Sequence, residues 1–137
     1  MSVAREGLTR YFRVVSQLAL GVFLVSAGVS HLTVSRLEFQ AQVPTWLPLD
    51  PDFVVVSSGV VEILLGFALI TLWRIRTRVG IVTALFFVVI FPGNINQFVN
   101  GIDAFGLNSD AARATRLLFQ PLLVLWALWA TEAVRRR

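Results

Sequence analysis

Residues 53–73 read Phe-Val-Val-Val-Ser-Ser-Gly-Val-Val-Glu-Ile-Leu-Leu-Gly-Phe-Ala-Leu-Ile-Thr-Leu-Trp, and this stretch decides the fold class. Glu62 is its only ionisable residue. A helix crosses the hydrocarbon core of a bilayer, about 30 Å thick, with about 20 mostly apolar residues. The stretch therefore predicts a membrane-spanning helix.

Three further stretches have the same apolar character, namely 14–33, 79–99 and 117–134. No long polar linker separates the four stretches. Helices are favoured as spanning elements because lipid cannot satisfy open backbone groups. Residues 1–137 are therefore predicted to form a single all-α domain, an integral membrane bundle of four helices with short connections.

Local signals mark the ends of these helices. Asp50 followed by Pro51 is expected to cap the second helix, and Ser109 or Asp110 is expected to cap the fourth. Between the first and second helices, residues 35–42 are expected to form a short helix in the membrane interface.

The composition excludes several classes of protein. The chain is 56% hydrophobic and 15% charged, whereas a soluble domain has about 45–50% apolar and about 25% charged residues, so a soluble enzyme is not expected. With no Cys, one His and one Met, the chain is short of ligands for a metal or haem site. The arginines flank the apolar stretches instead of forming one basic face, so no nucleic-acid partner is expected.

The arginines also set the expected orientation. Three of them, Arg36, Arg113 and Arg116, lie on one side of the predicted membrane. The other nine lie on the opposite side, and they are Arg5, Arg10, Arg13, Arg74, Arg76, Arg78, Arg135, Arg136 and Arg137. Because arginine is enriched on the cytoplasmic side, we expect a bacterial cytoplasmic membrane protein with both termini in the cytoplasm. A cleaved signal peptide at the first stretch is the alternative, and an uncleaved anchor is favoured.

Glu62 is the most informative residue of the second predicted span. An ionisable group near the middle of a span is costly and usually faces the bundle interior. Gly59 and Gly66 share its helix face, and such small residues let another helix approach. We therefore expect Glu62 to face inward as the floor of a pocket in the outer half of the bundle. The alternative is a neutral carboxylic acid that bonds a backbone carbonyl and has only a structural role.

Each of the other three spans carries one polar residue on a face of small residues, namely His31, Asn94 and Gln120. At about 1.5 Å per residue these three side chains lie close to one level, above Glu62. Arg116 at the mouth is long enough to reach down toward Glu62. The candidate ligand-binding residues are therefore His31, Glu62, Asn94, Gln120 and Arg116, with no metal site and no assigned catalytic residue. The alternative is structural, because amides commonly join membrane helices and a histidine can cap a helix end.

Five motifs follow one another along the chain, and they are Ala27-Gly28-Val29-Ser30-His31, Val43-Pro44-Thr45-Trp46-Leu47-Pro48, Ser58-Gly59-Val60-Val61-Glu62-Ile63-Leu64-Leu65-Gly66, Phe91-Pro92-Gly93-Asn94-Ile95 and Arg116-Leu117-Leu118-Phe119-Gln120-Pro121. Together they resemble the DoxX family of small four-span membrane proteins, over nearly the whole chain. Ser35 departs from the pattern, since family members often have a proline there. The resemblance implies a four-helix fold, with the polar residues of the spans as recurring positions. It also implies association with quinone-reducing or other membrane redox complexes.

These observations lead to one functional expectation and two alternatives. We expect an accessory membrane protein whose pocket binds a quinone or a lipid and supports a membrane redox complex. A quinone fits because its tail passes between helices, while its carbonyl accepts a hydrogen bond from His31 or Asn94 and Glu62 exchanges protons. The alternatives are an oxidoreductase subunit with proton transfer at Glu62 and a purely structural assembly protein. Whether the chain is an enzyme stays open, and the lack of a separate cofactor motif in the sequence makes the enzyme alternative less favoured.

Overall fold

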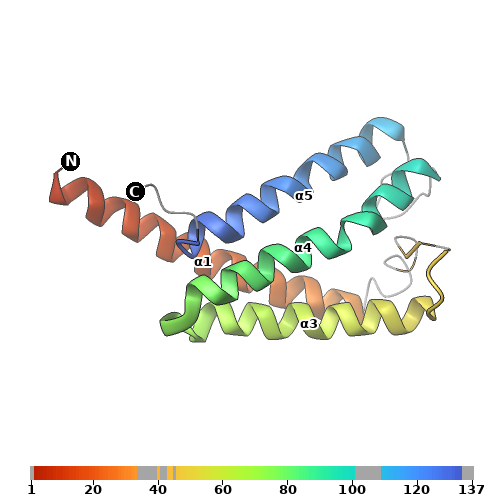
Figure 1. Cartoon of the computed structure of the whole chain (residues 1–137), viewed down its shortest axis with the longest axis horizontal. Coiled ribbons are helices and arrows are strands. Elements are labelled where there is room, and N and C mark those ends of the chain that lie inside the picture. The colour runs from red at the N-terminus through yellow and green to blue at the C-terminus, as the bar shows by residue number, and fades with distance from the viewer. Residues whose placement is uncertain (1, 34–39, 41–42, 45, 101–108, 134–137) are drawn as a thin grey trace.

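The structure, a computed structural model, describes residues 2–33, 40, 43–44, 46–100 and 109–133. Within this part of the chain the fold is all-helical (Figure 1). The elements are α1 (Val3–Leu32), α3 (Pro51–Thr71), the short 3-10 helix η1 (Trp73–Ile75), α4 (Arg76–Val99) and α5 (Asp110–Ala130). The prediction of an all-α bundle with four long helices is confirmed.

Three segments are long and apolar enough to cross a membrane: α1, α3, and η1 together with α4. The apolar part of α5 is shorter, at 114–130. The helix α1 begins at Val3, well before the predicted start at residue 14, because the polar N-terminal residues continue the helix. Its 30 residues extend about 45 Å, which is longer than the hydrocarbon core of a bilayer.

The helix boundaries follow the local sequence signals in two places. The Asp50 side chain accepts a hydrogen bond from the backbone N–H of Asp52, and Pro51 occupies the first turn of α3. Ser109, rather than Asp110, caps α5 by accepting from the backbone N–H of Ala112 at 3.2 Å. Both caps satisfy amide groups that have no partner within the helix.

The end of α5 differs from the prediction. The helix stops at Ala130 rather than at residue 134. Beyond it, Thr131 is fully buried and donates from its hydroxyl to the carbonyl of Ala127 at 2.7 Å. Glu132 then adopts a positive φ of 60°, a conformation that cannot continue a right-handed helix. The expected interfacial helix at 35–42 lies outside the described residues, apart from Gln40.

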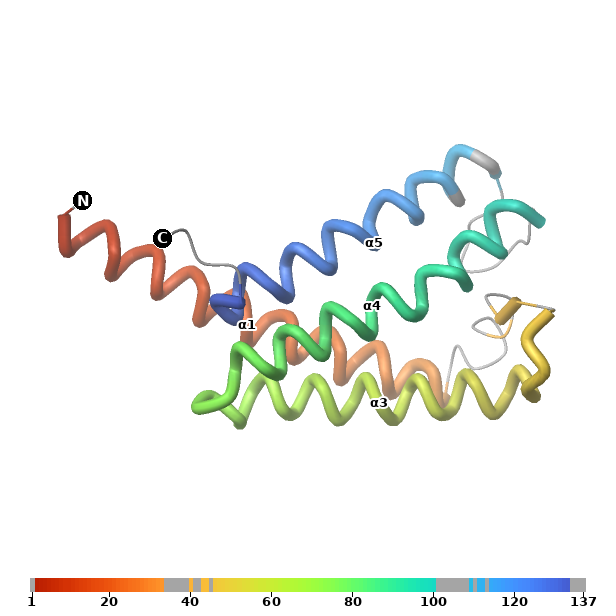
Figure 2. Tube along the Cα trace, in the orientation of Figure 1, coloured from red at the N-terminus to blue at the C-terminus, as the bar shows by residue number. Residues whose placement is uncertain are grey.

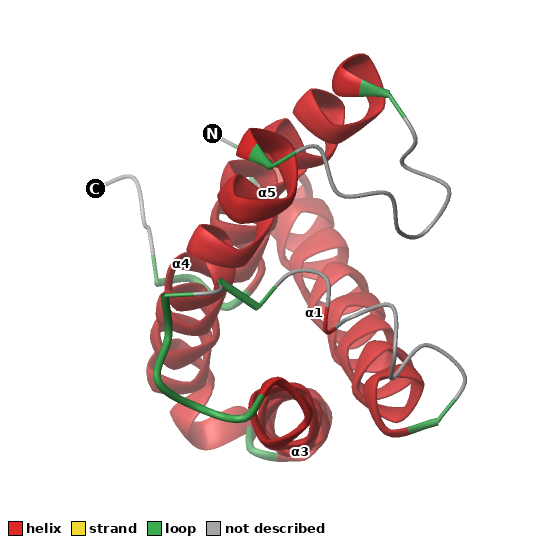
Figure 3. Ribbon diagram, turned by 90° about the vertical axis from the view of Figure 1, so that its right-hand side faces the viewer, coloured by secondary structure: helices red, strands yellow, loops and turns green. Residues whose placement is uncertain are grey.

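The helices form two antiparallel pairs, α1 with α3 and α4 with α5, and packing is most extensive within each pair. The pairs meet at one end of the bundle, which we call the base, where η1 joins α3 to α4 and where α5 ends (Figures 1 and 2). From the base, α4 diverges from α3 toward the opposite end, which we call the wide end (Figure 1). The N-terminal part of α1 projects beyond the base (Figure 2). Figure 3 shows the bundle from the side of the wide end.

Backbone-to-backbone contact holds α1 against α3. A Cβ atom added at Gly28 would lie 2.6 Å from the carbonyl oxygen of Gly59, and one added at Gly66 would lie 2.7 Å from the carbonyl oxygen of Gly21. Contacts this short leave room only for glycine, so the two helices approach as closely as their backbones allow. The inward-facing small-residue stripe predicted on both helices is confirmed.

Polar contacts join the two helix pairs at the base. The Trp126 indole donates to the hydroxyl of Ser16 at 2.7 Å. The Arg13 guanidinium donates to the Trp129 carbonyl at 2.7 Å and lies 5.0 Å from the centre of the Trp129 ring. Within the α4–α5 pair, Gly80 lies so close to the buried Thr131 that a Cβ atom there would collide with it. The contacts between α1 and α5 therefore hold the two helix pairs together at the base, and the pairs separate only toward the wide end.

Candidate functional site

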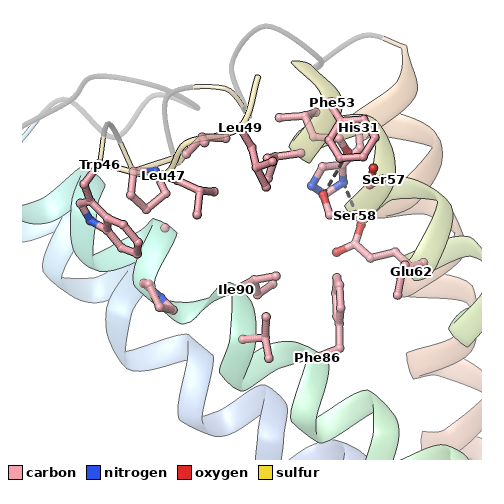
Figure 4. Close-up of a pocket in the computed structure, with 18 residues that line it drawn as sticks. His31, Trp46, Leu47, Leu49, Phe53, Ser57, Ser58, Glu62, Phe86 and Ile90 are labelled. Atoms are coloured by element: carbon pink, nitrogen blue, oxygen red, sulfur yellow. Dashed lines mark hydrogen bonds and ion pairs between the residues drawn. The ribbon is translucent and has the colours of Figure 1, made fainter. Parts of the chain in front are cut away.

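A cavity of about 510 Å³ opens where the two helix pairs separate (Figure 4). One wall is α3, and Phe86 and Ile90 of α4 face it from the other side. The segment around Trp46 and Leu47 covers the wide end. The complete lining is His31, Val43, Pro44, Trp46, Leu47, Leu49, Phe53, Val54, Val55, Ser57, Ser58, Val61, Glu62, Phe86, Val89, Ile90, Pro92 and Gly93. Most of these side chains are apolar, so the cavity suits a hydrophobic molecule.

His31 and Glu62 form a buried pair in the wall of this cavity. The His31 Nδ1 atom lies 2.8 Å from Oε2 of Glu62, and the exposed fractions of the two residues are 8% and 5%. Nδ1 also lies 2.9 Å from the carbonyl oxygen of Ala27. Nδ1 is therefore within hydrogen-bond distance of both the Ala27 carbonyl and the Glu62 carboxyl group.

The Glu62 carboxyl group keeps hydrogen-bonding capacity beside the cavity. Among the described residues, Oε2 is held by the ion-pair contact to His31 and by no hydrogen bond. Glu62 lines the cavity, so a ligand head group there can donate a hydrogen bond to its carboxyl group.

The relative depth of the two residues differs from the prediction. Glu62 was expected well below His31, but a Cβ atom added at Gly59 would lie 2.7 Å from Cβ of His31. His31 is therefore level with Gly59, one helical turn from Glu62, and the two side chains meet directly. The reason is that α1 ends at Leu32, beside the middle of α3 rather than beside its beginning.

Asn94, Gln120 and Arg116 are brought together, but away from the cavity lining. The Gln120 amide donates to the Phe87 carbonyl at 2.6 Å, and its Oε1 accepts from Arg116 Nη1 at 3.2 Å and from Asn94 Nδ2 at 3.4 Å. The bonds of Gln120 to Phe87 and to Asn94 connect α4 to α5, which favours the structural alternative for Asn94 and Gln120. The bond from Arg116 lies within α5. Oδ1 of Asn94 is buried without a hydrogen-bond partner among the described residues.

Arg116 relates the amide side chains of Asn94 and Gln120 to the cavity. It is half-buried, and its positive charge is near enough to Glu62 for the two charges to attract. The predicted five residues thus divide into a cavity pair, His31 with Glu62, and an interhelical group, Asn94 with Gln120 and Arg116. Their binding roles stay predictions.

Trp46 and Gln17 show what the sequence reasoning missed. Trp46 was noted in the sequence only as part of a motif, but it lines the cavity. Gln17 is fully buried in α1, where its amide donates to the Leu69 carbonyl at 2.7 Å. The rule that selected Glu62, a polar residue within an apolar span, also applies to Gln17. No signal in the sequence places Trp46 over the cavity, since that contact depends on how the connection folds back.

A membrane four-helix bundle with a buried carboxyl and imidazole pair beside an apolar cavity is the class that this fold and site define. The chain belongs to the family described as "Domain of unknown function (DUF8561)", whose model matches residues 20–131. No curated protein and no solved structure matches the chain.

The family match corrects the resemblance drawn from the sequence motifs. All five motifs lie within residues 20–131, and the model that matches there is DUF8561, not DoxX. The identification as a DoxX-like protein was therefore wrong. Its motifs consist largely of glycine, serine and branched apolar residues, which closely packed membrane helices share for physical reasons. The redox association implied by that resemblance does not carry over to this chain.

Proposed function

We propose that this membrane protein binds a hydrophobic small molecule with a polar head group in the cavity beside His31 and Glu62. The observation that carries the proposal is the buried pair of His31 and Glu62 in the wall of an otherwise apolar cavity. An apolar pocket with a few convergent polar groups is the usual form of a small-molecule site. His31 positions the carboxyl group, and Glu62 accepts a hydrogen bond from the head group or exchanges a proton with it.

A quinone is the first ligand to test, and a lipid is the second. A quinone head group has two oxygens that accept hydrogen bonds, and its reduced form donates them, so it is compatible with a carboxyl group that exchanges protons. A lipid hydroxyl group would donate to the Glu62 carboxyl group without any proton exchange. Mass spectrometry of small molecules that co-purify with the native protein separates these two ligands. A bound quinone would support a role beside a membrane redox complex, whereas a bound lipid would not.

Trp46 supplies a direct assay for binding. Decylubiquinone added to the reconstituted protein is expected to quench the fluorescence of Trp46, because this residue lines the cavity. The Trp46 signal is the fluorescence of the parent protein minus that of Trp46→Phe. The subtraction removes the contributions of the other three tryptophans. Saturable quenching that disappears in Trp46→Phe supports the proposal. Quenching that rises linearly with quinone, or is the same in both proteins, contradicts a quinone site here.

We also propose that both termini lie in the cytoplasm of a bacterial cell. The proposal is supported by the arrangement of the bundle, in which the N-terminus of α1, the turn at η1 and the end of α5 lie on the same side (Figure 1). Arg74 is exposed near this end, whereas Trp46 is at the wide end. The excess of arginine at the base gives the direction.

Single cysteines in this cysteine-free chain test the orientation. In intact cells, an impermeant thiol reagent is expected to label Trp46→Cys and to label Arg74→Cys only after the membrane is opened. The reverse pattern would show that the base faces outward.

A further inference from the structure

The cavity is open on the side between α3 and α4. These two helices are joined through η1 at the base and diverge toward the wide end (Figure 1). Two of the lining residues flank this opening and are exposed: Val61 of α3 at 40% and Val89 of α4 at 72%. Exposed side chains that also line a cavity mark the places where it reaches the protein surface. Trp46, Leu49 and Phe53 of the lining are exposed as well, so the cavity also reaches the surface at the wide end. We call the space between Val61 and Val89 the lateral gap.

The lateral gap faces the hydrocarbon region rather than water. One turn closer to the base, Leu64 on α3 and Leu85 on α4 are also exposed. The surfaces on both sides of the gap are therefore apolar over successive turns, and these turns belong to two segments that are apolar enough to span a membrane. Exposed leucine and valine side chains along such segments are expected to contact lipid tails.

The polar atoms of the cavity lie far from the wide end. Glu62 follows Pro51, the first residue of α3, by about 17 Å of helix at 1.5 Å per residue. A head group bound to Glu62 and His31 is therefore deep in the hydrocarbon layer. A cavity of about 510 Å³ has the size of sites for drug-sized molecules, and it encloses a head group with only the first part of a long chain.

We propose that the ligand carries one long apolar chain, which leaves the cavity through the lateral gap and lies among the lipid tails. This inference rests on the proposed function and specifies its ligand as a molecule that resides in the bilayer. The head group is held by the His31 and Glu62 pair. The chain passes between Val61 and Val89, where the walls are apolar and the surrounding medium matches the chain. Entry and exit then occur sideways from the bilayer.

Val89→Trp tests the gap, and Val88→Trp is its matched control. Val88 is the preceding residue of the same helix, is 54% exposed, and does not line the cavity. The probes are decylubiquinone and the same quinone head group without a chain, 2,3-dimethoxy-5-methylbenzoquinone, both read through Trp46 fluorescence. Val89→Trp is expected to weaken binding of the chain-bearing probe at least tenfold and to leave the head-group probe unchanged. Val88→Trp is expected to change neither.

Val61→Trp on the opposite wall provides a second variant with the same expected selectivity, and thermal stability of each variant verifies folding. If Val89→Trp and Val61→Trp weaken binding of both probes equally, or weaken binding of neither probe, the proposed chain path is overturned. The head-group site stands in either case. If neither probe binds the parent protein, the proposed function fails for quinones and the inference fails with it. A chain-terminal diazirine on decylubiquinone gives an independent readout. Adducts are expected on α3 and α4 beside the gap, and adducts confined to α1 or α5 overturn the proposal.

Discussion

Gly66→Leu is expected to destabilise the protein by about 3 kcal/mol, the upper part of the usual range for overpacking. A Cβ atom at this position would lie 2.7 Å from the Gly21 carbonyl oxygen and 2.9 Å from the backbone nitrogen of Val25. Both atoms belong to the backbone of α1, so no side-chain rotation relieves the collision and the helices must move apart. The measurement is thermal unfolding of the purified protein in detergent.

The chain contains a matched control for this substitution. Gly7 is also in α1, but a Cβ atom there meets nothing within 4 Å. Gly7→Leu is therefore expected to leave stability unchanged or slightly raised, since leucine favours a helix more than glycine does. Gly66→Ala is expected to give an intermediate loss, because its Cβ alone already meets the backbone of α1. If Gly66→Leu unfolds at the same temperature as the parent, the close α1–α3 contact is wrong.

Glu62→Gln is expected to fold normally and to bind the reduced head-group probe, 2,3-dimethoxy-5-methylhydroquinone, whose hydroxyl groups donate, about tenfold more weakly or worse. The side chain keeps its shape, but a hydrogen bond to a charged group, with a typical net energy of about 1.5–3 kcal/mol, is replaced by a neutral one. The pH dependence of binding is also expected to change, because the amide of glutamine has no carboxyl proton to lose or gain. Binding is measured through Trp46 fluorescence across a pH series.

A second substitution at the same position separates binding from packing. Glu62→Ala leaves a cavity beside His31 and is expected to lower stability by about 2–3 kcal/mol in addition to weakening binding. If the role of Glu62 is only structural, Glu62→Gln leaves the affinity and its pH profile as in the parent, and Glu62→Ala lowers stability alone. That result would contradict the proposed site.

The sequence was sufficient to predict the helices and their buried faces. Apolar runs of spanning length predicted four helices, and spacing along each helix predicted that Gly28, Gly59, Glu62 and Gln120 face inward. These features depend on the 3.6-residue period and on the cost of polar groups in lipid, which act within one segment. The family could not be predicted in this way, because motifs made of small and apolar residues reflect close helix packing rather than common ancestry.

What the sequence by itself determined is thus the element type, the buried faces and the caps at Asp50 and Ser109. The tertiary structure alone decided how far each helix is shifted along its neighbour. The close contact of Gly28 with Gly59 and of Gly21 with Gly66 fixes the register of α1 on α3, and this register brings His31 to Glu62. The separation of the helix pairs beyond the base leaves the cavity, and it assigns Asn94 and Gln120 to the α4–α5 contact instead. Register and divergence arise from contacts between segments far apart in the chain, so no single segment encodes them.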